Sequence, residues 1–479
     1  MKKLFILSMA LMLAFSCSDD TTTTDEDEVV IETLTGSTFT LSQFEVHTFP
    51  ATDTWEITDQ SVTADDFEGL SAAIEYISLN ETSREISLIF SGLDQIPNYA
   101  IFGRELSDSA RCFSALYSIE ATNVTSIGAH AFEFCDGLTS VIFGDVDTIG
   151  KYAFNGCASL EAIDLSRLTI IEDCAFNGCR ALEMVDLSLA ESIGMQAFMY
   201  CDSMSGELSL PVASQIGVGA FAYCSAITSL DAPNVLYIDQ SAFCECSLIE
   251  SVSTPNIEEI GDYAFIACTA LTSFDITESL LSIGNGVFND CTALEELILD
   301  SEASFAYDYG VLFNDEMDEA IIALPSVVKD EIALDMANIR PRAFYNCDLI
   351  TSLTLTTAES VSVDAFAHCN ALETVSLPMA TELESGAFYD CDAMTTFSAP
   401  YLTVIGCNSF YNCDSLETMT FATAEDALLT SIDENAFYRC YIEDTVIYLG
   451  SVNTDLVTYG DTLTLGSFSA EFKKIYLLE

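Results

Sequence analysis

Basic residues are scarce in this chain of 479 residues. Lys and Arg number 14 against 76 Asp and Glu, which gives a formal net charge of −62 at pH 7. Only 19% of the residues are charged, so the charge comes from imbalance rather than from high polarity. Such a chain repels phosphate backbones and anionic lipids, which argues against nucleic acid and acidic membrane surfaces as partners. Cationic partners and divalent cations stay open.

Histidine is almost absent, and catalytic motifs are lacking. His47, His130 and His368 stand in unrelated positions, and there is no H-E-x-x-H motif, Ser/His/Asp spacing or Gly-rich phosphate loop. Carboxylates are so abundant that a pair of them carries little information. We therefore expect no enzyme activity, no catalytic residue, no metal centre and no required cofactor, with calcium as the one cation that the acidic composition leaves open.

Apolar runs long enough to cross a bilayer are lacking as well. Lys2 and Lys3 precede an apolar stretch at residues 4–15, which is too short for a mature span and typical of a secretory signal. The stretch ends in Ala-Phe-Ser-Cys, which resembles a bacterial lipobox and implies acylation at Cys17. The alternative is an ordinary signal peptide with an incidental cysteine.

The residues that follow favour the lipoprotein interpretation. Residues 18–28, SDDTTTTDEDE, are polar and acidic and contain no apolar residue, so we expect a flexible tether after a signal peptide at 1–17. Acidic residues directly after the lipid-bearing cysteine resemble the export signal of surface lipoproteins in the Bacteroides group. We predict an outer-membrane lipoprotein exposed on the cell surface and held to the membrane only through its N-terminal lipid.

One phrase, Ala-Phe-x-x-Cys followed by spaced aliphatic residues, dominates the rest of the chain. In residues 149–165, IGKYAFNGCASLEAIDL, Phe154 and Cys157 stand at i, i+3 spacing, which predicts one inward face of a short helical turn. Ile163 and Leu165 stand two apart, which predicts a short strand. The phrase recurs at a period of mostly 22 or 23 residues, with its phenylalanines at Phe132, Phe154, Phe176, Phe198, Phe221, Phe243, Phe265, Phe288, Phe344, Phe366, Phe388, Phe410 and Phe437.

Such units cannot bury their apolar faces alone, so they must stack. The period therefore predicts an α/β solenoid of 22–23-residue rungs, with a parallel sheet on one face, short helical turns on the other, and a cap at each end. Its extended faces suit a macromolecule better than a metabolite.

The rungs resemble the leucine-rich repeats of bacterial surface proteins of the BspA type, which read L-x-x-[IVL]-x-[LIF]-P-x-x-[VLT]-x-x-I-G-x-x-A-F-x-x-C. Residues 372–391, LETVSLPMATELESGAFYDC, carry nearly every element. The resemblance covers residues 85–449, although many rungs lack the proline and residues 101–126 fit poorly. It implies a right-handed leucine-rich repeat superhelix and a surface protein that binds or adheres.

The irregular stretch at residues 309–342 resembles the wide rung of that family. The apolar runs 311–313 and 320–324 flank an acidic turn, which predicts a hairpin inserted at about 305–342. We expect an N-terminal cap at 29–84, with a helix over 64–79 because its apolar residues have helical spacing. A strand-rich cap is expected at 450–479.

The cysteines suggest a disulfide ladder, which we reject for the repeated slot. Thirteen of them, among them Cys157, Cys179 and Cys391, occupy the same inward position and should point in parallel. Stacked helical turns need roughly 8 Å, whereas a disulfide allows Cα separations of about 4.4–6.8 Å. These cysteines should behave as small hydrophobic residues.

Two surface features are candidate binding sites. The first is a set of outward strand residues, where like charges on neighbouring rungs would be relieved by a cation or a cationic partner: Asp164, Asp186, Asp231 and Asp275. The second is a tyrosine stripe after the repeat phenylalanines, interrupted by Ala367, of a residue type favoured at recognition surfaces: Tyr345, Tyr389, Tyr411 and Tyr438. The alternatives are a solvated polar face and inter-rung packing.

The sequence leaves three functional hypotheses open. The first is adhesion, in which the chain binds proteins of host cells, extracellular matrix or neighbouring cells. The second is glycan capture for nutrient uptake, which would use exposed aromatic platforms. The third is a structural coat component with no specific ligand.

Overall fold

The computed structural model describes most of the repeat region and a few flanking strands. It covers residues 94–98, 100, 116–328, 330–421, 429–433 and 435–440, with the strands at 74–79, 86–90, 446–449, 457–458, 464–465 and 474–477. The chain divides into unit 1, Met1–Ile227, and unit 2, Thr228–Glu479, and each is described by itself.

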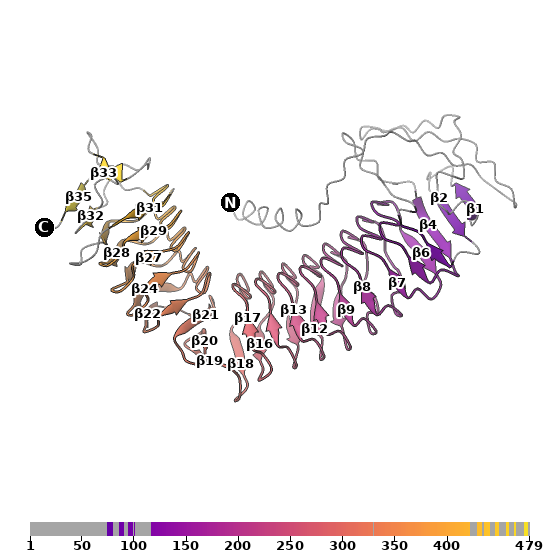
Figure 1. Ribbon diagram of the computed structural model, residues 1–479, viewed down its shortest axis with the longest axis horizontal. Coiled ribbons are helices and arrows are strands. Elements are labelled where there is room, and N and C mark those ends of the chain that lie inside the picture. Colours follow the sequence, from indigo (N-terminus) through magenta and orange to yellow (C-terminus); the bar gives the residue numbers. More distant parts are fainter. Residues whose placement is uncertain are drawn as a thin grey trace. The chain divides into compact units, whose positions relative to one another are not determined.

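Each rung contributes up to two strands, which form two separate rows. The longer strands of unit 1 are β1 (Ile74–Leu79), β2 (Ile86–Phe90), β4 (Leu116–Ala121), β6 (Ser140–Phe143) and β10 (Gly206–Ser209). Its two-residue strands are β3 (Gln95–Ile96), β5 (Ser126–Ile127), β7 (Thr148–Ile149), β8 (Ile170–Ile171), β9 (Ser192–Ile193) and β11 (Gln215–Ile216). Figure 1 shows β4 and β6 side by side, and their pairing is parallel.

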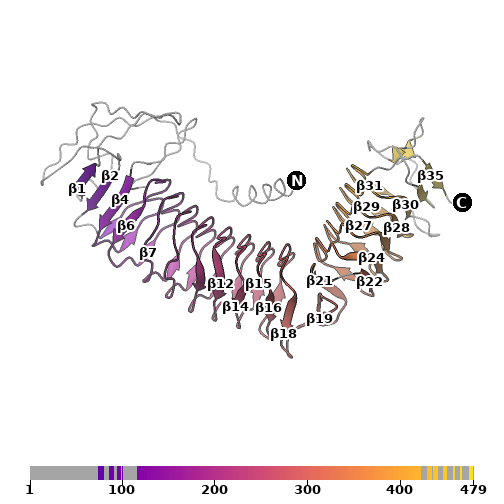
Figure 2. The ribbon, with the colours of Figure 1, turned by 180° about the vertical axis from the view of Figure 1, so that it is seen from behind.

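Unit 2 repeats this arrangement. Its longer strands are β12 (Ile227–Asp231, which begins at the unit boundary), β14 (Ser251–Ser253), β16 (Ser273–Ile276), β18 (Glu296–Leu299), β22 (Asp330–Leu334), β24 (Ile350–Leu355), β26 (Thr374–Ser376), β28 (Thr396–Ala399), β30 (Thr418–Phe421), β32 (Val446–Leu449) and β35 (Lys474–Leu477). Its two-residue strands are β13 (Tyr237–Ile238), β15 (Glu259–Ile260), β17 (Ser282–Ile283), β23 (Asn338–Ile339), β25 (Ser360–Val361), β27 (Glu382–Leu383), β29 (Val404–Ile405) and β31 (Ser431–Ile432). Figure 2 shows the row of β27, β29 and β31 apart from the row of β24, β28 and β30.

The Ala-Phe-x-x-Cys segments are turns, and the described residues contain no α-helix. The predicted solenoid is confirmed, and its short turns are closed by i to i+3 hydrogen bonds such as that from the N–H of Cys157 to the carbonyl of Phe154 at 3.1 Å. The N–H of Phe154 donates to the carbonyl of Ala175 in the next rung at 2.8 Å, and the N–H of Gly156 donates to Asn177 at 2.7 Å. Tyr152 and Gly156 adopt left-handed φ values of 59° and 75°, which turn the backbone towards the neighbouring rung. These bonds between rungs replace the bonds of a helix.

The core of each unit is a stack of phenylalanine rings. Phe154 and Phe176 lie 5.4 Å apart between ring centroids with an interplanar angle of 4°, and both are fully buried. The stack continues rung by rung in unit 1, and unit 2 contains equivalent stacks before and after its insertion. Aliphatic residues of the strands close the other side of this core. The predicted burial of the repeat phenylalanines is confirmed.

The ladder cysteines donate hydrogen bonds to backbone carbonyls. Sγ of Cys179 lies 3.1 Å from the carbonyl oxygen of Phe154, and Sγ of Cys391 lies 3.2 Å from that of Phe366. None of the described cysteines forms a disulfide. The distance argument against disulfides is wrong, however, because stacked rungs lie near 5 Å apart. Each of these two thiols instead points towards a carbonyl oxygen of a neighbouring rung.

We predict that the ladder thiols react only when the chain unfolds. Burial raises the pKa of the Cys391 thiol, and burial likewise raises that of Cys179, so reactive thiolate is scarce. Cys407 is partly exposed and provides the internal control. In timed alkylation of the native full chain, read by mass spectrometry, Cys407 should react at least roughly a thousandfold faster than Cys179 or Cys391. Equal rates at the three positions would contradict the hydrogen-bonded ladder.

An antiparallel insertion interrupts unit 2. It consists of β19 (Phe305–Asp308), β20 (Val311–Asn314) and β21 (Glu319–Ala323), and β20 pairs with β21 as the two apolar runs predict. The additional strand β19, paired with β20, was not predicted. Buried side chains of β20 and β21, including Leu312 and Ile321, anchor the insertion in the core.

The structure also corrects the N-terminal cap. Residues 74–79 form β1, which pairs antiparallel with β2, so the predicted helix over 64–79 is wrong in this part. Most of the expected caps, the tether and Cys17 lie outside the described residues. At the C-terminal end, β33 (Val457–Thr458) and β34 (Thr464–Leu465) form an antiparallel pair.

Candidate binding surfaces

The strand face consists of the outward side chains of the longer strands. In unit 2 its middle is lined by hydroxyl groups in two rows. The pairing of β24, β26, β28 and β30 places the rows in register: Ser352, Thr374, Thr396 and Thr418 form one row, and Thr354, Ser376, Ser398 and Thr420 form the other. Oγ1 of Thr374 lies 2.9 Å from Oγ of Ser352, so neighbouring rungs are linked by their hydroxyls. This part of the strand face is polar and carries no charged side chain in either row.

The four candidate aspartates do not form a continuous ladder. The Asp164 carboxylate accepts hydrogen bonds from the N–H and the hydroxyl of Ser166, at 3.0 and 2.6 Å, and these bonds lower its pKa. Asp186 likewise accepts the N–H of Ser188 at 2.9 Å.

In unit 2, Asp231 pairs in register with Ser253, and Asp275 pairs with Ile298. Each of these two carboxylates therefore has an uncharged neighbour on that side, and the expected charge ladder is interrupted. No group of three or more His, Cys, Asp or Glu side chains in the described part of the chain is placed to hold a metal ion.

The tyrosine stripe is more continuous than the sequence indicates. Tyr389 and Tyr411 stack with ring centroids 4.7 Å apart, and Tyr411 and Tyr438 stack at 5.2 Å. His368, one residue beyond the interrupting Ala367, fills the gap with edge contacts to Tyr345 at 5.1 Å and to Tyr389 at 5.4 Å. An unbroken aromatic row therefore runs from Tyr345 to Tyr438.

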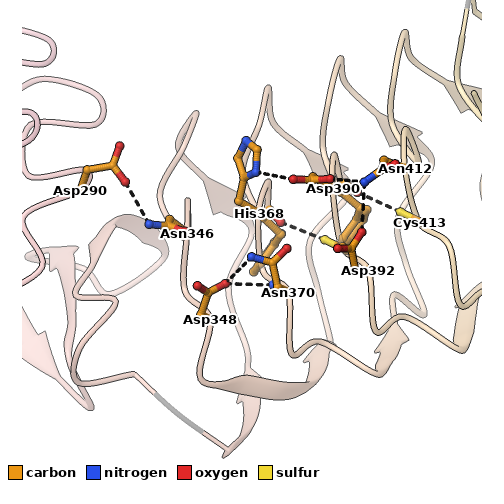
Figure 3. Close-up of polar contacts among 12 residues, drawn as sticks. Asp290, Asn346, Asp348, His368, Asn370, Asp390, Asp392, Asn412 and Cys413 are labelled. Atoms are coloured by element: carbon orange, nitrogen blue, oxygen red, sulfur yellow. Dashed lines mark hydrogen bonds and ion pairs between the residues drawn. The ribbon is translucent and has the colours of Figure 1, made fainter. Parts of the chain in front are cut away.

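Polar side chains of neighbouring rungs contact one another at these turns, as Figure 3 shows for His368, Asp390 and Asn412. The imidazole Nδ1 of His368 lies 2.9 Å from a carboxylate oxygen of Asp390. The amide of Asn412 donates to Asp390 and also to Asp392, the latter at 3.1 Å. We call the aromatic row and these polar neighbours the turn ridge, which comprises Tyr345, His368, Tyr389, Asp390, Asp392, Tyr411, Asn412, Asp414 and Tyr438.

The surroundings of two ridge carboxylates, Asp392 and Asp414, disfavour their charged forms. Burial, followed by the charges of Asp390 and Asp414, raises the pKa of Asp392. Burial and the charge of Asp390 raise the pKa of Asp414, while Arg439 lowers it. One oxygen of Asp414 is enclosed and has no hydrogen-bond partner in the described part of the chain. The ridge therefore has carboxylates that a further positive charge would stabilise.

A buried arginine begins the ridge. Arg342 is 6% exposed, and its Nε donates to a carboxylate oxygen of Asp364 at 3.2 Å. Its guanidinium carbon lies 4.5 Å from the ring centroid of Tyr345 and 5.4 Å from that of Tyr263. Tyr263 precedes the insertion and Tyr345 follows it, so this cation joins the two sides of the inserted hairpin. No local sequence pattern singles out Arg342, because the residues that it joins lie far apart in the chain.

The insertion presents an exposed tyrosine at its first turn. Tyr309 is 86% exposed and adopts a left-handed φ of 50°, which is unfavourable for a residue of this type. Gly310 follows at a φ of 82°, so the two residues make the tight turn between β19 and β20. A strained and exposed aromatic residue is a reason to suspect a binding role.

Comparison with known families decides the classification. The family profile described as "BspA type Leucine rich repeat region (6 copies)" matches residues 104–212, 214–314 and 337–456, which is most of the chain. The chain belongs to the BspA-type leucine-rich repeat family. Members of this family are generally surface proteins that act through binding or adhesion. No protein with curated annotation matches this BspA-type chain.

Several solved structures resemble this BspA-type chain. A leucine-rich cell surface protein from Faecalibacterium prausnitzii is 20% identical, with 73% of this chain and 93% of that chain covered and a TM-score of 0.45. A leucine-rich repeat protein from Bacteroides ovatus is 21% identical, with 78% and 97% covered and a TM-score of 0.44. One from Eubacterium ventriosum is 16% identical, with 80% and 83% covered and a TM-score of 0.45. Within the described residues, no helix is long and apolar enough to cross a membrane.

Proposed function

We propose that this BspA-type protein is a lipid-anchored adhesin that binds proteins of host or neighbouring cells through the strand face of unit 2 and the inserted hairpin. The observation that carries this proposal is the double row of hydroxyls from Ser352 to Thr420, in register across four rungs. Hydroxyls both donate and accept hydrogen bonds, and they cost little to desolvate compared with charges. A partner can therefore be held by area and complementarity without a covalent step.

The anchoring part of the proposal rests on the N-terminal sequence. The signal-like stretch ends at Cys17, and the acidic tether at 18–28 would separate the solenoid from the membrane. These residues lie outside those that the structure describes. Metabolic labelling with a radioactive fatty acid should mark the full chain and should fail to mark the Cys17→Ala variant. Equal labelling of both chains would refute acylation at this cysteine.

The binding proposal can be tested on an array of extracellular-matrix proteins and glycans probed with the full chain. Binding to proteins is the expected result. Ser376→Trp would place a bulky ring on the strand face, whereas Ser360→Trp makes the same change in β25, in the other strand row. We expect only the first variant to lose binding. Hits on glycans alone would favour the glycan-capture alternative, and no hits at all would favour a structural coat component.

A separate prediction concerns the hairpin tip. Asn tolerates left-handed φ values better than Tyr, so Tyr309→Asn should stabilise the chain by about 0.5–1 kcal/mol while weakening partner binding. Chemical unfolding and binding to the best array hit would be measured on the same samples. Tyr309→Phe keeps the ring and serves as the matched control for binding. If Tyr309→Asn binds as well as the parent chain, the hairpin tip is not part of the interface.

A further inference from the structure

Basic side chains of this chain already lie against tyrosine rings at the turns of both units. In unit 2, the Arg342 guanidinium carbon lies 4.5 Å from the Tyr345 ring centroid while its Nε bonds to Asp364. In unit 1, Lys151 Nζ lies 5.3 Å from the ring centroid of Tyr152 and 3.5 Å from the Asp173 carboxylate. The same pair of groups, a tyrosine face and a carboxylate, thus binds a positive charge in each unit.

The C-terminal half of the ridge carries these groups in greater number. Tyr389, Tyr411 and Tyr438 stack at 4.7 and 5.2 Å, and Tyr438 is 44% exposed. Asp390 follows Tyr389, whose pKa is raised by burial and by nearby charges that include Asp390, and burial together with the charge of Asp390 also raises the pKa values of Asp392 and Asp414. Tyrosine rings therefore occupy three successive rungs, two of which also carry unfavourably placed carboxylates, and the exposed ring of Tyr438 ends the stack.

Arg439 and the imidazole of His368, the basic side chains near that segment, do not fully offset the negative charge of its carboxylates. His368 pairs with Asp390, and Arg439 lowers the pKa of Asp414. Asp392 accepts a hydrogen bond from the neutral amide of Asn412 at 3.1 Å, and His368 only partly offsets the rise in its pKa. An oxygen of Asp414 stays enclosed and without a hydrogen-bond partner within the described part of the chain. A positive group from outside would therefore meet both unneutralised charge and tyrosine rings.

The tyrosine rings indicate which kind of cation this segment of the ridge would bind. A metal ion gains little from neutral phenol rings, and no described group of carboxylates and imidazoles is arranged to hold one. A guanidinium is planar, stacks on aromatic faces and bonds to carboxylates through several N–H groups, as Arg342 does in this structure. We propose that the ridge segment around Tyr389, Tyr411 and Tyr438 binds arginine side chains of an extended basic segment in a partner protein.

This surface is separate from the strand face, so the two proposals can fail independently. The probe is a fluorescent ten-residue peptide of alternating Arg and Ser, titrated into the full chain at low and moderate salt. The matched peptides carry citrulline, a neutral isostere of arginine, or Lys in place of Arg. We expect the Arg peptide to bind at least about tenfold more tightly than the citrulline peptide and several-fold more tightly than the Lys peptide.

Variants separate the ridge from the general negative charge of the protein. Tyr438→Leu should weaken binding of the Arg peptide by about three- to thirtyfold, whereas Tyr438→Phe should leave it nearly unchanged, because the exposed aromatic ring is kept. Tyr237→Leu removes a partly exposed tyrosine away from the ridge and should have no effect. Thermal melting of each variant checks that the fold is intact.

A charge control completes the test. Asp392→Asn with Asp414→Asn removes two ridge charges, whereas Glu172→Gln with Glu191→Gln removes two exposed charges from unit 1. Only the ridge pair should weaken binding markedly, by about tenfold, with the unit 1 pair changing it less than twofold at moderate salt. Equal losses in the two double variants, equal binding of the citrulline or Lys peptide, or an unaffected Tyr438→Leu would each overturn the proposal.

Discussion

Replacing Arg342 by Met should destabilise unit 2 by about 2–4 kcal/mol. Breaking a buried ion pair typically costs about 3–5 kcal/mol, because the remaining charge stays desolvated. The expected cost is somewhat smaller here, since the Asp364 side chain is 23% exposed. The variant also loses the stacking of the guanidinium on Tyr263 and Tyr345, and with it the contact that joins the rungs on either side of the insertion.

The pH dependence of the stability lost in Arg342→Met shows whether the unpaired charge of Asp364 causes the loss. Burial raises the pKa of Asp364, while the charge and hydrogen bond of Arg342 and the charge of His368 lower it, so removing Arg342 raises that pKa further. A carboxyl whose pKa is higher in the folded chain binds its proton more tightly there, so stability falls as the pH rises through that range. The deficit of Arg342→Met should therefore be full at neutral pH. It should shrink as the pH falls through the raised pKa of Asp364.

Urea unfolding at pH 7.5 and pH 5 would measure both effects. The second substitution Asp364→Asn should restore at least half of the loss, because it removes the unpaired charge. Arg167→Met is the matched control: Arg167 is 53% exposed and pairs with Asp145 and Asp147 at 3.7 and 3.5 Å, so its loss should cost less than about 1 kcal/mol. A pH-independent deficit, or no rescue by Asp364→Asn, would show that lost packing rather than the charge dominates.

Much of the fold could be predicted from the sequence, because the same residue pattern recurs in every rung. Burial of Phe154 and Cys157 follows from their spacing alone. Their local conformation does not, since i, i+3 spacing fits both a helix and a turn with i to i+3 hydrogen bonds. The bonds that decide it, such as Phe154 to Ala175, join residues about one rung apart. The residue pattern of a single rung cannot predict these hydrogen bonds between rungs.

The candidate binding surfaces, too, could be predicted only in part from the sequence. The tyrosines of the stripe share one slot of the repeat, so the sequence reveals them. His368 completes the row from the next slot, and only the stacking of rungs brings its ring between Tyr345 and Tyr389. At the N-terminal end, residues 74–79 contain apolar residues that fit a helix and also alternate as in a strand. Pairing with β2 selects the strand.

Gly386→Ala should cost more than Gly219→Ala, although both glycines occupy the same slot of the repeat. Their φ values are 66° and 60°, so an alanine would meet a left-handed penalty of roughly 1–2 kcal/mol at either position. A Cβ at Gly219 would find its nearest neighbours at 3.4 and 3.9 Å, whereas a Cβ at Gly386 would lie 2.1 Å from Oδ1 of Asp364. The Asp364 side chain would have to move, and its other oxygen is bonded to Arg342. We expect a total cost of about 3–5 kcal/mol for Gly386→Ala.

The steric contribution to the Gly386→Ala cost can be measured in a variant that lacks the Asp364 side chain. Asp364 has a left-handed φ of 53°, so glycine fits its backbone without strain. In an Asp364→Gly chain, Gly386→Ala should cost only the left-handed penalty, close to the value for Gly219→Ala in the parent chain. The difference between the two backgrounds, measured as a double-mutant cycle by urea unfolding, then isolates the steric displacement of Asp364. If Gly386→Ala costs the same in both backgrounds, the close approach to Asp364 contributes nothing and the penalty is one of backbone conformation alone.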